Sequence, residues 1–151
     1  MLKRICVPLV LLVAASVNAQ SFGAMMTGSQ EVPAVQTPGL GVAEISVMSL
    51  PDGTLAFRGA IMASRLTGMP VAYHVHAAPR GENGPIVIDL VGAETHRFVF
   101  GRTVFLVFEG IVADPNGDIL AAMLAGMTYV NVHTAANPGG EIRGQLFRAS
   151  R

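Results

Sequence analysis

A two-residue alternation of apolar and polar side chains, broken by short turns, is the feature that most constrains the fold of this 151-residue chain. Residues 41–48 alternate in this way, the segment 51–53 (PDG) reverses the chain, and residues 55–61 alternate again. A period of two places alternate side chains on opposite faces of a β-strand, and proline, aspartate and glycine together are typical of a turn. The two segments are therefore predicted to form a β-hairpin.

Segments of the same kind recur along the chain, separated by turn signals at intervals of about 8–15 residues, as in all-β domains. The other predicted strands are 21–28, 71–76, 85–91, 97–112 (one strand, or two broken near Gly101), 127–134 and 141–147. One helix is predicted near 115–125, because Asp114-Pro115 favours a helix start and Gly126 a helix end. The sequence predicts an all-β fold, an antiparallel β-sandwich or barrel, with this one short helix.

The first 19 residues differ in character from the rest of the chain. A basic start, Lys3 and Arg4, precedes an apolar run of about a dozen residues and a small-residue end at 17–19, the pattern of a secretory signal. A membrane anchor is the alternative, but a bilayer span needs about 20 apolar residues. We therefore predict a signal peptide at 1–19, cleaved before Gln20, and a periplasmic or secreted domain at 20–151 with no membrane insertion.

Removal of the signal changes the charge and cysteine content. The whole chain has ten basic and ten acidic residues; without Lys3 and Arg4, eight basic residues face ten acidic ones and no lysine remains. A nucleic-acid partner is not expected, because it would need a basic surface. The one cysteine, Cys6, leaves with the signal, so the exported domain has no disulfide and depends on its core for stability.

Two of the four histidines stand one residue apart in the predicted strand 71–76. Alternation places His74 and His76 on one face of the strand, with Cα atoms about 6.6 Å apart, so both rings can reach one ion at about 2 Å. The alternative is that they are two polar residues on a solvated face.

His133 lies at the end of the predicted strand 127–134, on the same face as Tyr129 and Asn131. A lone histidine there would more often bond to the following turn. Three histidines are harder to explain in that way, because a sandwich or barrel brings distant strands side by side. Imidazole ligands without thiolates suit copper, zinc, iron or nickel, so His74, His76 and His133 are predicted to bind a metal ion.

Other candidate sites are less well supported. His96 lies in a predicted loop, where it either closes the metal site as a fourth ligand or lies in water. The segment 114–118 (DPNGD) partly matches a calcium loop but lacks the later glutamate, and is interpreted as a helix cap. Hydrolase chemistry is least supported, because the mature chain has no cysteine and no serine in a nucleophile-elbow context.

Three longer motifs resemble the CHRD domain, named from chordin and widespread in exported bacterial proteins. They are A-M-M-T-G-S-Q-E-V-P-A-V at 24–35, Y-H-V-H-A-A-P-R-G-E-N-G-P-I-V at 73–87 and L-A-G-M-T-Y-V-N-V-H-T-A-A-N-P-G-G-E-I-R-G-Q-L at 124–146. The resemblance spans about residues 22–148, so the mature chain is predicted to be one CHRD domain. In chordin this domain is an extracellular structural module, which makes an adhesion or scaffold role the alternative to metal binding.

A looser resemblance links the histidine order to copper,zinc superoxide dismutases, which are Greek-key β-sandwiches. It implies an immunoglobulin-like or superoxide-dismutase-like Greek-key sandwich or barrel. It also implies that His74, His76 and His133 are copper ligands and that His96 stands where the bridging histidine does. The chain departs from that family in having no cysteine pair and no loop crowded with zinc ligands, so copper is expected and zinc is less expected.

Three polar residues of the last predicted strands have expected roles beside the metal. Arg143 is a candidate anion guide, with a salt bridge to Glu141 or another edge-strand carboxylate as the alternative. Glu141 and Asn131 are expected to orient the imidazoles through hydrogen bonds. The leading hypothesis is an exported copper-binding domain in copper handling or a superoxide-dismutase-like redox role. Because the methionines form no M-X-X-M array, they are interpreted mainly as core residues.

Overall fold

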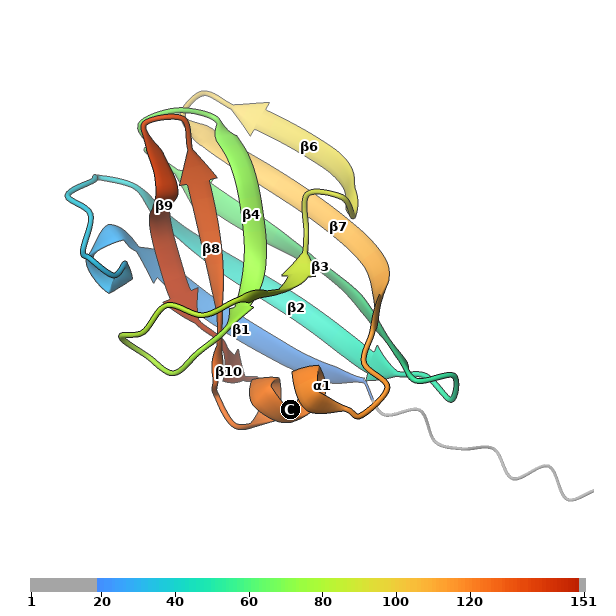
Figure 1. The fold of residues 1–151 in the computed structure, drawn as a ribbon. Coiled ribbons are helices and arrows are strands. Elements are labelled where there is room, and N and C mark those ends of the chain that lie inside the picture. The colour runs from blue at the N-terminus through green and yellow to red at the C-terminus, as the bar shows by residue number, and fades with distance from the viewer. Residues whose placement is uncertain (1–18, 150–151) are drawn as a thin grey trace, which may run out of the picture.

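The structure is a computed structural model that describes residues 19–149, and ten antiparallel strands make up most of it (Figure 1). The strands are β1 (Gln20–Thr27), β2 (Leu40–Ser49), β3 (Thr54–Ser64), β4 (Pro70–Ala77), β5 (Ile86–Asp89), β6 (Glu94–Phe100), β7 (Thr103–Ala113), β8 (Thr128–Thr134), β9 (Asn137–Gln145) and β10 (Phe147–Arg148). A 3-10 turn, η1 (Gly28–Gln30), and one helix, α1 (Asp118–Leu124), complete the described elements.

The strands form one sheet in the order β5-β4-β8-β9-β1-β2-β3-β7-β6, with β10 paired to β1. The sheet curls into a half-barrel, so that β4 and β8 lie over β2 and β3 in Figure 1. The predicted all-β antiparallel class with one short helix is confirmed. The curl matters for function because it gives β4, β8 and β9 an outer face separate from the core.

Local sequence patterns explain the hairpins. Strands β2 and β3 pair from Leu40–Ser64 to Ser49–Leu55, which confirms the predicted hairpin. The segment predicted as one or two strands is two, β6 and β7, and Gly101 between them has a φ of 60°, a conformation that glycine adopts without strain.

Helix α1 begins later than Asp114-Pro115 suggested. A turn closed by the Gly117 amide and the Asp114 carbonyl comes first. The Asp114 carboxylate then accepts hydrogen bonds from the backbone N–H groups of Ile119 and Leu120. Asp114 therefore caps the helix, as predicted, but from a position four residues before its first residue.

Among residues 19–149, no helix is both long enough and apolar enough to cross a membrane.

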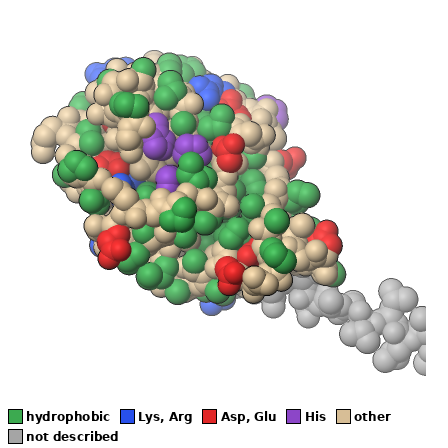
Figure 2. Space-filling view, in the orientation of Figure 1, with side chains coloured by type: hydrophobic (Ala, Val, Ile, Leu, Met, Phe, Trp, Pro, Cys, Tyr) green, Lys and Arg blue, Asp and Glu red, His purple; other side chains and the backbone are tan. Residues whose placement is uncertain are grey.

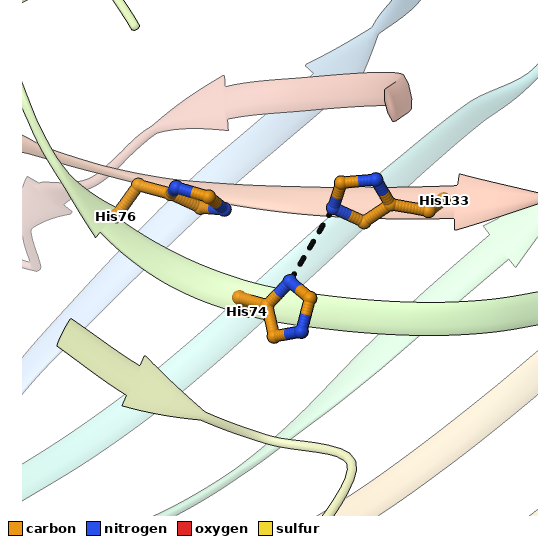
Figure 3. A group of neighbouring side chains, drawn as sticks. All are labelled: His74, His76 and His133. Carbon is orange, nitrogen blue, oxygen red and sulfur yellow. Dashed lines mark hydrogen bonds between the residues drawn. The ribbon is translucent and has the colours of Figure 1, made fainter. Parts of the chain in front are cut away.

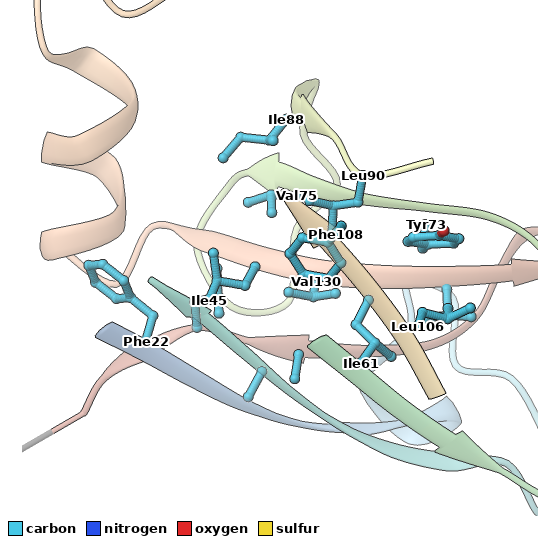
Figure 4. Packing of buried hydrophobic residues seen from close by; sticks show 14 of the residues in the cluster. Phe22, Ile45, Ile61, Tyr73, Val75, Ile88, Leu90, Leu106, Phe108 and Val130 are labelled. Carbon is cyan, nitrogen blue, oxygen red and sulfur yellow. The ribbon is translucent and has the colours of Figure 1, made fainter. Parts of the chain in front are cut away.

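The core fills the concave side of the curled sheet (Figure 4). Its fully buried members come from both halves of the sheet and include Phe22, Ile45, Leu55, Ile61, Tyr73, Val75, Leu106, Phe108, Val130 and Ile142. Burial of this apolar surface is the main driving force for the fold. Because Tyr73 and Val75 point into the core, alternation turns their neighbours on β4 to the outer face.

Glu141 holds two loops against the outer face of β8 and β9 through hydrogen bonds. Its carboxylate is fully buried and accepts hydrogen bonds from the hydroxyls of Thr37, Thr67 and Thr134, and from the Thr67 backbone N–H. These partners belong to the loops before β2 and β4 and to β8, so one side chain holds three parts of the chain together. The predicted signal peptide lies outside the described residues, except for Ala19.

Candidate metal centre

Strands β4 and β8 bring three histidines together on the outer face of the sheet (Figure 3). His74 and His76 project from β4. His133 projects from the neighbouring strand β8, two residues beyond Asn131, which is the register partner of His74. In Figure 2 histidine side chains gather at the surface on this side of the molecule, which leaves the group open to solvent. The structure thus brings together the three residues predicted as metal ligands.

The distances within the group match the size of a metal ion. One ring nitrogen from each histidine lies within 4.8 Å of the other two, and His74 Nδ1 is 3.3 Å from His133 Nε2. Two nitrogens bound at about 2.0 Å in a tetrahedral arrangement are about 3.3 Å apart. The pair His74–His133 already has that spacing, and the wider separations need the rings to close by about 1.5 Å at most.

Backbone carbonyls orient two of the rings. His76 Nδ1 is 2.9 Å from the Gly84 carbonyl oxygen, and His133 Nδ1 is 2.9 Å from the Pro138 carbonyl oxygen. A carbonyl only accepts hydrogen bonds, so both Nδ1 atoms carry the proton and both Nε2 atoms keep a free lone pair. The Nε2 of His76 is buried and has no hydrogen-bond partner in the described residues. A buried polar atom is rarely left in that state, and a metal ion would satisfy it.

His74 differs from the other two because its Nδ1 points into the group. Without a metal ion, His74 Nδ1–H donates to His133 Nε2, whose lone pair is free. The opposite nitrogen of His74, Nε2, lies 4.0 Å from a carboxylate oxygen of Asp89. If the metal replaces the Nδ1 proton, the remaining proton sits on Nε2 and faces that carboxylate.

Gly84 is needed for the carbonyl that holds His76. A Cβ atom at Gly84 would lie only 1.8 Å from the Ala77 carbonyl oxygen, so any other residue would push the loop away from β4. The sequence predicts no role for Gly84 and Pro138, because both orient the imidazoles through backbone carbonyls. The glycine before Pro85 was the one available signal.

The electrostatic environment keeps the imidazoles neutral. The pKa of His74 is lowered, mainly by burial and further by the neighbouring His133 and His76. Burial also lowers the pKa of His76 and of His133, outweighing the effect of their carbonyl partners, and Arg143 adds to this lowering. Neutral imidazole is the form that binds metal ions, so the site is ready for a cation at neutral pH.

Arg143 lies under the loops beside the metal group instead of at its mouth. Its guanidinium is 4.4 Å from the ring centre of Tyr129, and that ring stacks on His76 with centres 4.8 Å apart. Arg143 is 5% exposed and donates to the Glu31 carboxylate at 2.8 Å and to the Glu82 carbonyl at 3.0 Å. This arrangement favours the salt-bridge alternative over an anion guide, with Glu31 as the partner in place of Glu141.

Asn131 and Glu141 do not orient the imidazoles, contrary to the prediction. The Asn131 amide donates to the Glu31 carboxylate at 3.2 Å, and the Glu141 carboxylate accepts hydrogen bonds from Thr37 and Thr67 in loops and from Thr134 on β8. A buried carboxylate needs several donors. Asn131 is one of the donors to Glu31, and Glu141 is itself a buried carboxylate whose donors are the threonines.

His96 is not part of the group. It lies on β6, where its ring is parallel to that of Phe98 at 6.0 Å and its Nδ1 is 3.3 Å from the Thr95 hydroxyl. Strand β6 ends the sheet opposite to the β5–β4 end, and the His96 side chain is exposed. Of the two predicted alternatives, the structure favours a solvated His96 over a fourth ligand.

Comparison with known proteins gives one match. The family profile described as the CHRD domain matches residues 22–146, a range that contains the three histidines and the loops that cover β8 and β9. No curated protein and no solved structure has significant similarity to the chain.

Proposed function

The chain belongs to the CHRD domain family, and from this premise we propose that it is an exported protein that binds one copper ion through His74, His76 and His133. One observation carries the proposal: the buried His76 Nε2 has no partner among the described residues, and it lies within 4.8 Å of ring nitrogens of the other two histidines. In a domain that served only as a scaffold, nothing would require this arrangement.

The donor set supports copper over other metals. Three neutral nitrogen ligands without thiolate suit borderline metals, and among divalent first-row ions copper binds such sites most tightly. Zinc is the weaker candidate. Copper bound by three protein ligands keeps a position for an exchangeable ligand and supplies one-electron cycling between Cu(I) and Cu(II).

Copper handling is the role that the surroundings of the site support best. The charged side chain nearest to His74 is the carboxylate of Asp89, which is 62% exposed, whereas Arg143 is buried and paired with Glu31. An exposed carboxylate attracts a cation and repels an anion. A superoxide-dismutase-like role would need a positive charge at the mouth of the site. Arg143 does not provide that charge, because it is buried and paired with Glu31.

The test is metal binding by the purified protein. Titration with Cu(II) followed by calorimetry is expected to give one tight site, and the electron paramagnetic resonance spectrum should contain coupling to three nitrogens. His74→Ala and His133→Ala should each cost more than the roughly 10–100-fold loss of affinity that follows removal of an orienting partner, because each removes a ligand. His96→Ala is the matched control and should bind as the wild type does.

Two results would refute the proposal. One is the absence of a stoichiometric copper site in the wild type, which would leave the adhesion or scaffold role as the better interpretation. The other is a loss of binding in His96→Ala equal to that in His133→Ala, which would show that copper binds at another place.

A further inference from the structure

The half-barrel is left open along a seam between β4 and β6. Among the described residues β6 pairs only with β7, so its other edge forms no ladder of backbone hydrogen bonds with a strand. The start of β4 lies beside this edge, where hydrogen bonds from side chains join the two strands. Tyr73 donates its hydroxyl hydrogen bond to Glu94, and Arg97 donates to the Pro70 carbonyl at 3.2 Å. These two contacts cover the first half of the free edge of β6, residues 94–97.

The second half of β6 has no such protection. Phe98, Val99 and Phe100 are three consecutive apolar residues on an edge strand, and they are 44%, 51% and 69% exposed. Soluble proteins usually protect a strand edge with charged residues or a covering segment. Three exposed apolar residues on an unpaired edge are therefore typical of a surface that binds an additional strand.

A cavity lies beside this half of the strand. Its volume is about 250 Å³, and it opens between the β6–β7 turn and the start of β4. The lining residues include Leu66, Met69, Pro70, Val99, Arg102 and Val104. Pockets for drug-sized ligands are usually larger, about 300–1,000 Å³, so this cavity suits one or two apolar side chains of a peptide.

One arginine, Arg102, lines the cavity, and a second one, Arg65, lies beside Arg102. The Arg65 backbone N–H donates to the Arg102 carbonyl at 2.9 Å, which places the two residues side by side. Both are exposed, and within residues 19–149 neither guanidinium has an acidic partner. An apolar cavity with one such arginine in its lining and a second beside it complements a segment that combines apolar residues with a carboxylate.

We propose that Phe98–Phe100 of β6 is a docking site for an extended peptide segment of a partner protein. The segment adds to β6 as a further strand, places an apolar side chain in the cavity, and pairs an aspartate, glutamate or terminal carboxylate with Arg65 and Arg102. Main-chain hydrogen bonds supply affinity, while the cavity and the arginines supply specificity. The proposal does not depend on copper, since Phe98–Phe100, Arg65 and Arg102 are not among the proposed copper ligands.

A displayed library of random heptapeptides, selected on the full protein, tests the proposal. Selected peptides are expected to share alternating apolar residues and at least one acidic residue. Synthetic peptides of that consensus should lose at least tenfold in affinity for the double variant Arg65→Glu, Arg102→Glu. Arg58→Glu, which reverses an exposed arginine on β3, is the matched control and should bind as the wild type does.

Amide chemical shifts then locate the bound peptide. The largest changes are expected at Phe98–Phe100, and equal melting temperatures of the variants show that they are folded. The absence of a consensus, equal affinity of the double variant, or shifts confined to another surface would each overturn the proposal. A wild-type protein that dimerises through this edge, as measured by sedimentation, would also overturn it and identify a second copy as the occupant.

Discussion

Each imidazole of the metal group is held by a different neighbour, and this decides which nitrogen is free. His76 and His133 give their Nδ1 protons to carbonyls of Gly84 and Pro138, so their Nε2 atoms are available. Residues 19–149 offer His74 no such carbonyl, and its Nδ1 faces His133. A metal ion held by the three rings would therefore have a mixed ligand set of one Nδ1 and two Nε2 atoms.

The mixed set predicts a change of tautomer at His74 when copper or its closed-shell substitute zinc binds. In the metal-free protein the proton is on Nδ1, and in the zinc-loaded protein it should be on Nε2, facing Asp89. Two-bond ¹H–¹⁵N spectra of the imidazoles distinguish the two forms. His76 and His133 should keep the Nδ1–H form throughout. A His74 already in the Nε2–H form without metal would contradict this assignment.

The environment of the Glu141 carboxyl predicts how the stability of the fold changes at acidic pH. Burial raises the pKa of its carboxyl, but hydrogen bonds from Thr134, Thr37 and Thr67 outweigh burial and leave the pKa below its ordinary value of 4.5. A carboxyl whose pKa is lowered by folding stabilises the fold above the unfolded pKa, and this contribution is lost as the pH falls through the folded pKa.

The substitution Glu141→Gln should therefore lower the free energy of unfolding by about 2–3 kcal/mol at pH 7, because hydrogen bonds to a charged acceptor are lost. The difference from the wild type should shrink below about pH 4.5 as the wild-type carboxyl is protonated. Urea denaturation at a series of pH values measures both effects. Glu44→Gln, on the exposed face of β2, is the control and should change stability little. A deficit that did not change with pH would mean that ionised Glu141 is not the cause.

At the scale of elements, the loop between β4 and β5 returns to β4 to orient one of β4's own side chains. The Ala77 N–H donates to the Pro85 carbonyl at 3.0 Å, which sets the loop against the strand. Gly84 then presents its carbonyl to His76 at 2.9 Å. The motif Y-H-V-H-A-A-P-R-G-E-N-G-P is therefore one unit, in which the histidines and the glycine that supports them occur together.

Gly84→Ala should lower copper affinity by about 10–100-fold, the usual cost of losing a group that orients a metal ligand. The added methyl cannot occupy the place 1.8 Å from the Ala77 carbonyl, so the loop must move and release His76. Gly68→Ala is the matched control, since nothing lies within 4 Å of a Cβ at that position. Copper titration of both variants checks the prediction. Unchanged affinity in Gly84→Ala would show that the carbonyl is dispensable.

At the scale of the whole molecule, the metal group joins two strands that belong to different hairpins. His76 and His133 lie on β4 and β8, which are separated in sequence by β5, β6, β7 and α1. A ligand that binds the folded state and not the unfolded chain stabilises the fold. Copper should therefore stabilise the whole half-barrel and not one hairpin alone.

Calorimetric melting should detect this effect. With free copper at a hundred times its dissociation constant, the gain is about 2.7 kcal/mol, equivalent to a rise of several degrees in melting temperature. His133→Ala should show almost no rise, while His96→Ala should rise as the wild type does. An equal copper-induced shift in the wild type and in His133→Ala would place the ion elsewhere.

Alternation along the chain was sufficient to predict several features of this protein. It identified the all-β class and the β2–β3 hairpin, and it placed His74 and His76 together on one face of β4. These features depend on neighbours in sequence, because the direction of a side chain from a strand follows from a period of two. The CHRD motifs also identified the family, since they are continuous segments.

Strand order and loop position, by contrast, were decided only by the tertiary structure. It placed β8 beside β4, paired Arg143 with Glu31, left His96 on β6 outside the histidine group, and supplied the carbonyls of Gly84 and Pro138. Such contacts join residues far apart in the chain or act through backbone groups that every residue has. Their positions depend on how the whole sheet curls around its core, and no local pattern specifies that curl.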